Sequence, residues 1–214
     1  MTWHEFERQA LAQALTDAGP GAPTLCEGWL SRHLAAHIVL RENAPLVAAG
    51  VVVPVLAERT ERAVGSLAST GTDPVGYAAL VARVAAGAPR WNPMSWSGDA
   101  ANLLEFFVHT EDVRRGAGPV DPLELAPAHT QALWRYLTRG APLLYRSTRV
   151  GVVLVVPGGP RRAVRRARGD AGTVVVRGEI GELVLHAFGR GGAARVHVLG
   201  DPEDVGALAR AMLS

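Results

Sequence analysis

The sequence predicts an α+β protein, with a helical bundle over residues 1–147 and a small α+β domain over residues 150–214. Two observations predict this division. Apolar residues recur every three or four positions as far as about residue 147, which is typical of amphipathic helices. From Val150 the pattern changes to short valine-rich runs separated by Pro and Gly, which indicates strands and turns. A helical region followed by mixed elements favours two regions with separate cores.

The helices of the first region can be placed by their start signals. Thr2 and Glu5 form a capping-box pattern ahead of the first apolar series. Ser31 is a candidate N-cap for a second helix that extends to about Ala49, and Asp99 is a candidate cap for a later one. The other helical patterns of this region are Val51–Ala68, Asp73–Ala86 and Pro127–Tyr145.

The C-terminal region reads as alternating short strands and helices. Two strands are expected on either side of a Pro-Gly-Gly-Pro turn between Gly151 and Gly169. The other expected elements are a strand at Thr173–Val176, a helix at Glu179–Phe188, a strand at Arg195–Leu199 and a helix at Pro202–Leu213.

The composition is that of a globular protein and excludes several classes. The uncharged run from Ala44 to Ala57 is too short for a membrane span and contains two prolines. Glu5 stands where a secretory signal would be basic. Cys26 is the single cysteine, which excludes an intramolecular disulfide and fits a reducing cytoplasm. A net charge of +2 is too small to indicate a nucleic-acid partner by itself.

One expected helix, from Gly98 to Gly116, carries a narrow polar strip. At about 100° per residue, Asn102, Glu105, His109 and Asp112 fall within roughly an 80° arc, and most of the remaining surface is apolar. The i, i+4 spacing of Glu105 and His109 lets a carboxylate oxygen and an imidazole nitrogen reach one metal ion. The strip alone is equally compatible with the solvent-facing edge of a core helix.

His37 supplies a second candidate ligand from a different helix. Leu34 and Leu40 lie three residues to either side of it, so the imidazole is expected to face a core. A histidine in such a place is more often a hydrogen-bonded core residue than a ligand. Metal sites in helical bundles are nevertheless built from facing helices, which keeps the ligand interpretation open.

Three segments resemble the DinB-like superfamily, and in particular the mycothiol-dependent maleylpyruvate isomerase family and its metal-binding relatives in actinobacteria. They are TLCEGWLSRHLAAH from Thr24, NLLEFFVH from Asn102 and GEIGELVLHAFGR from Gly178. By this resemblance His37, Glu105 and His109 match the zinc ligands of the family. It also implies a four-helix bundle for the helical region, and mycothiol as the thiol cofactor or co-substrate. In the second domain it implies an arginine that binds an anionic substrate, for which Arg190 is the candidate.

Such a ligand set favours catalytic zinc. Two neutral imidazoles and one carboxylate leave Zn²⁺ with a net charge of +1 and an open fourth position, where a thiol would lose its proton. Asn102 and Asp112 are candidate partners that orient Glu105 or His109 from behind. For Asp112 the alternative is a surface charge paired with Arg115 or Arg8.

The leading hypothesis is therefore a zinc-dependent enzyme, a transferase or isomerase that uses a small thiol and acts on a small electrophile. The alternative is a metal-binding adaptor or regulator without catalysis, because no general base is identifiable beyond the three ligands. A nucleic-acid binder is a third hypothesis. It rests on an arginine run that a charged sheet edge explains better, namely Arg161, Arg162, Arg165, Arg166 and Arg168.

Several other residues are candidates for parts of the site. His33 could form a competing i, i+4 pair with His37, but a solvent-exposed position is expected for it. Cys26 could be a redox thiol or an extra ligand, and a loop thiol without a role is the favoured interpretation. Three tryptophans could line the mouth of a pocket, although tryptophan in a bundle is more often part of the core: Trp29, Trp91 and Trp96.

Overall fold

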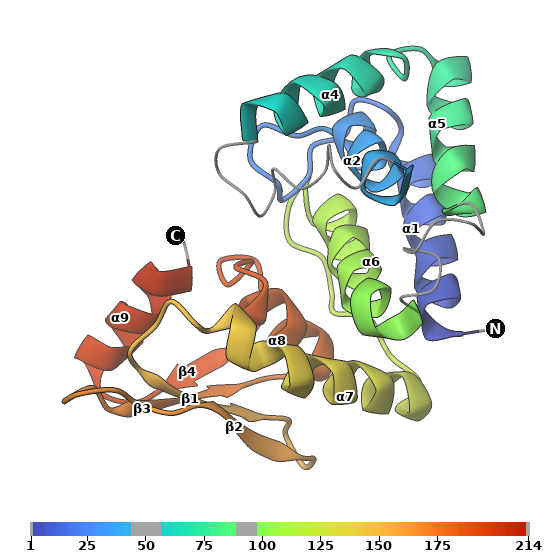
Figure 1. The fold of residues 1–214 in the computed structure, drawn as a ribbon. Helices are drawn as coiled ribbons and strands as arrows, with labels where there is room; N and C mark the ends of the chain where they lie inside the picture. Colours follow the sequence, from blue (N-terminus) through green and yellow to red (C-terminus); the bar gives the residue numbers. More distant parts are fainter. Residues whose placement is uncertain (1, 44–56, 89–97, 213–214) are drawn as a thin grey trace. The chain divides into compact units, whose positions relative to one another are not determined.

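The fold is that of a computed structural model, which describes residues 2–43, 57–88 and 98–212. It divides into two compact units, Met1–Val120 and Asp121–Ser214. The first unit is helical and the second combines helices with a small sheet, which confirms the predicted α+β class (Figure 1). Within the described ranges no helix has the length and apolar character needed to cross a membrane.

The first unit is a bundle in which α1 packs against α5 and α6, while α2 packs against α4 and α5. Each of these helices begins within four residues of an expected start, apart from α4, whose expected start at Val51 falls outside the described residues. The helices of this unit are α1 (Trp3–Ala18), α2 (Ser31–Asn43), α4 (Ala57–Ser69), α5 (Pro74–Ala86) and α6 (Gly98–Arg114). The predicted extension of α2 to Ala49 also lies outside the described residues.

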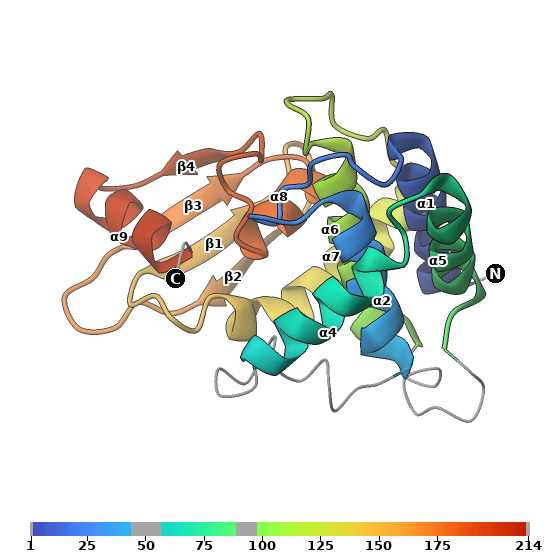
Figure 2. The ribbon, with the colours of Figure 1, turned by 90° about the horizontal axis from the view of Figure 1, so that it is seen from above.

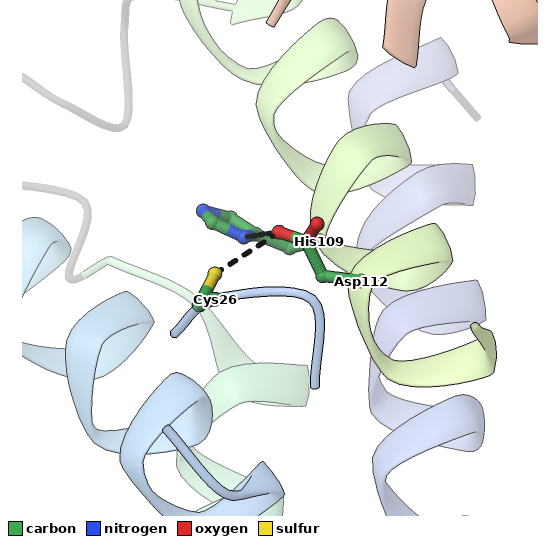
Figure 3. Close-up of side chains that lie close together, drawn as sticks. All are labelled: Cys26, His109 and Asp112. Carbon is green, nitrogen blue, oxygen red and sulfur yellow. Dashed lines mark hydrogen bonds and ion pairs between the residues drawn. The ribbon is translucent and has the colours of Figure 1, made fainter. Parts of the chain in front are cut away.

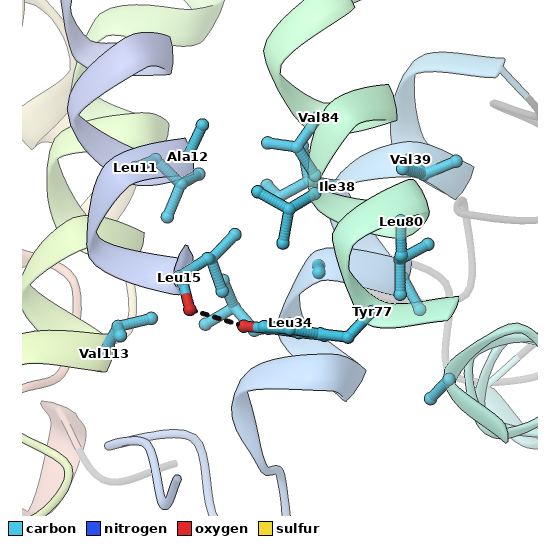
Figure 4. Close-up of a cluster of buried hydrophobic side chains, with 14 of the residues drawn as sticks. Leu11, Ala12, Leu15, Leu34, Ile38, Val39, Tyr77, Leu80, Val84 and Val113 are labelled. Atoms are coloured by element: carbon cyan, nitrogen blue, oxygen red, sulfur yellow. Dashed lines mark hydrogen bonds between the residues drawn. The ribbon is translucent and has the colours of Figure 1, made fainter. Parts of the chain in front are cut away.

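The core of this unit lies between α1, α2 and α5 and is made of aliphatic side chains. Leu15, Leu34 and Val84 have no exposed surface, and Figure 4 shows them meeting across the three helices. The hydroxyl of Tyr77 enters this core and donates to the carbonyl of Leu15 at 2.8 Å. A buried hydroxyl needs such a partner, so the bond fixes α5 against the end of α1.

One expected helix cap is confirmed, and the structure adds a second. The carboxylate of Glu5 accepts a hydrogen bond from the backbone N–H of Thr2 at 2.8 Å, as the capping box requires. Asp73 caps α5 by accepting from the N–H groups of Val75 and Gly76, each at 3.0 Å. Both caps satisfy donors that the first turn of a helix leaves unpaired.

Two other expected caps were wrong, because the side chains serve a different element. Ser31 is already the first residue of α2, and its hydroxyl donates to the carbonyl of Gly19. Asp99 lies inside the first turn of α6, and its carboxylate accepts from the N–H of His4 at 2.8 Å. Each side chain thus joins its helix to another segment, a role that local sequence does not specify.

The second unit contains a four-stranded sheet in the order β2-β1-β3-β4, in which β1 and β3 are parallel and the outer pairs are antiparallel. Figure 1 shows its helices on one face of this sheet. All the strands and helices expected after Val150 are present. The elements are α7 (Pro127–Leu144), β1 (Gly151–Val155), β2 (Arg161–Arg165), β3 (Thr173–Arg177), α8 (Ile180–Ala187), β4 (His197–Leu199) and α9 (Pro202–Met212).

The alternation of side chains along the strands explains this two-layer arrangement. Val152 and Leu154 on β1 and Val174 and Val176 on β3 are fully buried, while Val153 between them is half-buried. Figure 2 shows the four strands side by side in the order β2-β1-β3-β4. The helix α7 packs on α8 and β2, so it groups with the second unit. The expected boundary, 1–147 and 150–214, counted this helix with the bundle, and as a domain boundary it stays a prediction.

The arginine run lies at the edge of the sheet. β2 is an outer strand, and Arg161 and Arg162 on it are exposed. Arg165 turns back instead, and its guanidinium donates to the carbonyls of Thr148 and Arg146, each at 3.0 Å. Exposed charge on an outer strand opposes edge-to-edge pairing with another chain, which is the interpretation that the sequence favoured.

A buried histidine in the second unit should make its stability depend on pH. The hydroxyl of Tyr145 donates to Nδ1 of His186 at 2.8 Å, and both side chains are buried. Burial lowers the pKa of His186 to about 4 and raises the pKa of Tyr145. The folded chain therefore keeps His186 neutral at a pH where the unfolded chain, with an ordinary pKa near 6.5, takes up a proton.

Below pH 6.5 the unfolded state binds more protons than the folded state, so a fall in pH favours unfolding. We expect up to about 3 kcal/mol of the unfolding free energy of the second unit to be lost as pH falls from about 6.5 to about 4. Urea unfolding across this range should show a shallower pH dependence for His186→Gln than for the wild type. His197→Gln, at an exposed position in β4, is the control. Equal slopes in all three chains would contradict the prediction.

Candidate metal centre

His37 lies in the middle of α2 and is 4% exposed, as the apolar neighbours in its sequence predicted. Its ring lies 5.3 Å from that of Trp29 and 5.4 Å from that of His109, measured between ring centres. Among the described residues, its Nδ1 atom is buried and has no hydrogen-bond partner. The imidazole is thus held mainly by packing, with its other nitrogen turned toward α6.

Glu105 and His109 face His37 from one side of α6. Oε1 of Glu105 lies 3.3 Å from Nε2 of His109, one turn further along the helix, and 3.8 Å from Nε2 of His37. The i, i+4 spacing on α6 and the crossing of α2 therefore bring together the three residues that the sequence singled out. Their ligand atoms all lie within 4.8 Å of one another.

The spacing of these atoms fits a tetrahedral ion. Donors that bind zinc at 2.0–2.3 Å in a tetrahedron stand about 3.3–3.8 Å apart. The separations of 3.3 and 3.8 Å from Oε1 to the two imidazole nitrogens match that requirement. The donor types, two nitrogens and one oxygen, are also those of catalytic zinc sites, so the residues present fit such an ion.

The charges of the cluster also favour a bound cation. Burial by itself would lower the pKa of His109, but hydrogen bonds with Asp112, Cys26 and Glu105 raise it well above its ordinary value. Burial would likewise raise the pKa of Glu105, which the bonds with His109 and His37 hold well below its usual range. The carboxylates thus concentrate positive charge on one ring. A divalent cation beside that ring would displace its proton, as histidine ligation requires.

Asp112 lies directly behind His109 and has no exposed surface. Its Oδ2 atom is 2.9 Å from Nδ1 of His109, so the carboxylate fixes the ring with Nε2 toward Glu105 and His37. A carboxylate on the far nitrogen is the usual partner of a metal-bound histidine. The alternative of a surface charge paired with Arg115 or Arg8 does not match this burial. That Asp112 serves a bound metal stays a prediction.

Asn102 reaches the cluster through a residue that sequence reasoning missed. Its Oδ1 atom accepts a hydrogen bond from the guanidinium of Arg41 at 2.8 Å. Arg41 stands one turn after His37 on α2, and its Nε lies 3.6 Å from Oε1 of Glu105. Asn102 therefore orients Arg41, and Arg41 in turn borders Glu105. The four-residue spacing from His37 was the signal in the sequence that could have identified it.

The loop between α1 and α2 covers the back of His109. The N–H of Leu25 donates to the carbonyl of Asp112 at 3.0 Å, which fixes the loop to the end of α6. Gly116 allows this close approach, because a Cβ atom there would lie 2.0 Å from the carbonyl oxygen of Pro23. Cys26, expected to have no role, is placed by this loop with its thiol donating to Oδ2 of Asp112 at 3.3 Å.

The remaining candidates are not members of the cluster, and two of them fall outside the described residues. His33 is half-buried and not exposed as expected, because its Nδ1 accepts from the N–H of Leu30 at 3.2 Å near the start of α2. Arg190 belongs to the second unit, where its guanidinium donates to the carbonyl of Phe188 at 2.7 Å. Trp91 and Trp96 lie outside the described residues.

The helical unit of this chain, with its candidate ligand cluster on facing helices, is of the DinB-like class of protein. The sequence model for the mycothiol maleylpyruvate isomerase N-terminal domain matches residues 4–114, which is just over half of the 214-residue chain. The chain therefore belongs to this family. The matched range ends with α6 and includes every residue of the cluster.

Two solved structures share the fold over nearly the whole chain. The first is the crystal structure of a mycothiol-dependent maleylpyruvate isomerase, at 19% identity and a TM-score of 0.56, covering 92% of this chain and 90% of that one. The second is a histidine-to-alanine mutant of the mycothiol-dependent maleylpyruvate isomerase, at 18% identity and a TM-score of 0.57 with the same coverage. At this identity the likeness shows the fold. No curated protein matches the chain.

Proposed function

We propose that the protein is a zinc-dependent enzyme that uses a small thiol, mycothiol, to transfer or isomerise a small electrophilic substrate. The observation that carries the proposal is the convergence of His37, Glu105 and His109, whose ligand atoms lie within 4.8 Å of one another. The family and the fold of its solved members support mycothiol as the thiol. The same family favours an isomerisation of the maleylpyruvate type as one member of this substrate class.

The residues of the cluster would divide the work between them. His37, Glu105 and His109 would hold the ion, and three protein ligands leave a tetrahedral ion one position for the thiol. Bound zinc supplies a positive charge that lowers the pKa of a thiol at this position and so makes it a nucleophile. Asp112 keeps His109 in the required tautomer, and Arg41 adds positive charge beside Glu105 where an anionic thiolate or substrate would arrive.

The proposal also assigns a role to Arg190 of the second unit and a cellular location to the protein. Arg190 is proposed to bind an anionic group of the substrate, as the family resemblance implies. The location is proposed to be the cytoplasm, where Cys26 would remain reduced. Neither point is needed for the metal site itself.

Metal analysis followed by turnover tests the proposal. We expect the purified full-length chain, dialysed against zinc, to retain one zinc ion, and to bind mycothiol only in the zinc-loaded form. Conversion of an electrophile such as maleylpyruvate should then require both zinc and mycothiol. His33→Ala, which removes a histidine of the same helix outside the cluster, is the matched control and should leave both properties unchanged.

The outcomes separate the proposal from its alternative. Zinc retention without mycothiol binding and without turnover would identify a metal-binding adaptor or regulator instead of an enzyme. Failure to retain zinc at all would overturn both. Since the thiol and the metal are measured separately from activity, a wrong choice of electrophile does not obscure the result.

A further inference from the structure

The opposite edge of the His109 ring faces a second group of donor atoms. Nδ1 of His109, Oδ2 of Asp112 and Sγ of Cys26 all lie within 4.8 Å of one another. Oδ2 is 2.9 Å from Nδ1 and 3.3 Å from Sγ, and Figure 3 shows both contacts meeting on this carboxylate oxygen. This group shares His109 with the cluster described above but uses the other ring nitrogen.

The thiol is held by a loop and does not need the side chain of His37. Cys26 belongs to the loop that the Leu25–Asp112 backbone hydrogen bond fixes to α6, and Thr24 holds the same turn by accepting from the N–H of Cys26 at 3.2 Å. Cys26 is half-buried, while Asp112 is fully buried. The three donors are therefore contributed by the loop and by α6.

The donor types favour a more thiophilic ion than those of the first cluster do. Thiolate sulfur is a soft ligand that favours Cd²⁺ and Zn²⁺ over harder cations, and it occurs with imidazole and carboxylate around such ions. For a tetrahedral Zn²⁺ ion, the Sγ–Oδ2 separation would have to widen by about 0.2 Å and the Nδ1–Oδ2 separation by about 0.4 Å, and the larger Cd²⁺ ion would need somewhat more. This widening replaces two hydrogen bonds by metal–ligand bonds.

We propose that Cys26, Asp112 and His109 form a second cation site, specific for a thiophilic divalent ion. Binding there removes the proton of the Cys26 thiol and any proton on Nδ1 of His109, and both protons go to solvent. Asp112 exchanges its two hydrogen bonds for a bond to the ion. Without the ion, the three side chains form the hydrogen-bonded triad described above.

Sharing of His109 couples the two sites. An imidazole with an ion on Nε2 gives up its Nδ1 proton only at a high free-energy cost, so an ion at either site should weaken binding at the other. A thiophilic ion would in this way oppose the zinc centre. This competition rests on the proposed function, whereas the second site itself does not, because it needs neither His37 nor Glu105.

Cadmium titration of the reduced, metal-free full-length chain tests the proposal, since a cadmium–thiolate bond gives an ultraviolet charge-transfer band. We expect the band to saturate at one Cd²⁺ per Cys26. Cys26→Ser should lose the band yet retain zinc at the first cluster. His37→Ala should keep the band, and Asp112→Asn should weaken the cadmium affinity at least about tenfold.

Other outcomes would overturn the inference. Absence of the band in the wild type would leave only the hydrogen-bonded triad. A band of equal affinity in Asp112→Asn and in His109→Ala would show that the thiol binds cadmium alone. Circular dichroism of each variant establishes that it is folded. Loss of zinc in His37→Ala tests the proposed function separately, so the two proposals can fail independently.

Discussion

His109→Ala is expected to abolish stoichiometric zinc binding and to remove the cadmium–thiolate site as well. His109 is the residue that the two clusters have in common: it contributes Nε2 to the first and Nδ1 to the second. Loss of a partner that only orients a ligand already costs about 10–100-fold in metal affinity. Removal of the ligand itself should therefore weaken zinc binding by at least about 100-fold.

The variant needs a control for folding, because Asp112 is fully buried and loses its main partner when the imidazole is removed. A buried carboxylate without that partner is costly. His109→Gln leaves an amide that can still reach Asp112, and Glu105→Gln weakens the first cluster from a half-buried position. Inductively coupled plasma analysis of the three dialysed proteins gives the zinc content. Full zinc retention by His109→Ala would show that the ligand assignment is wrong.

The sequence predicted the α6 half of this site because helical spacing determines it. Glu105, His109 and Asp112 are three and four residues apart, so their side chains share a face whatever surrounds the helix. The facing position of His37 required a second helix, and only the family resemblance linked the two in advance. The three were brought together as expected, although their role as ligands stays a prediction.

The residues that sequence reasoning missed are those positioned by contacts between distant segments. Arg41 reaches Glu105 across two helices, and the thiol of Cys26 depends on a loop that one backbone hydrogen bond fixes to α6. The spacing of Arg41 from His37 places the two on one face of α2, but it does not show that α6 lies opposite, and the loop of Cys26 has no periodic pattern. The placement of α7 is open to the same difficulty. An amphipathic pattern shows that a helix has a buried face but does not show which element covers it.

The largest stability effect in the first unit is expected at the ion pair of Arg8 and Glu42. The guanidinium of Arg8 on α1 donates to both carboxylate oxygens of Glu42 on α2, one of them at 2.7 Å. It also donates to the carbonyl of Val84 on α5 at 3.0 Å and lies 4.6 Å from the ring of Phe106 on α6. Both side chains are buried, so this one group joins four helices.

Removal of one partner leaves the other charge buried. Glu42→Leu is therefore expected to lower the free energy of unfolding by about 3–5 kcal/mol, as found when a buried pair is broken from one side. The double variant Arg8→Met/Glu42→Leu removes both charges and fills similar volume, so it should be more stable than Glu42→Leu by several kcal/mol. Urea unfolding gives the free energy of unfolding of the wild type, Glu42→Leu and the double variant. Equal stability of the single and double variants would show that the pair is solvated and that its burial does not govern the bundle.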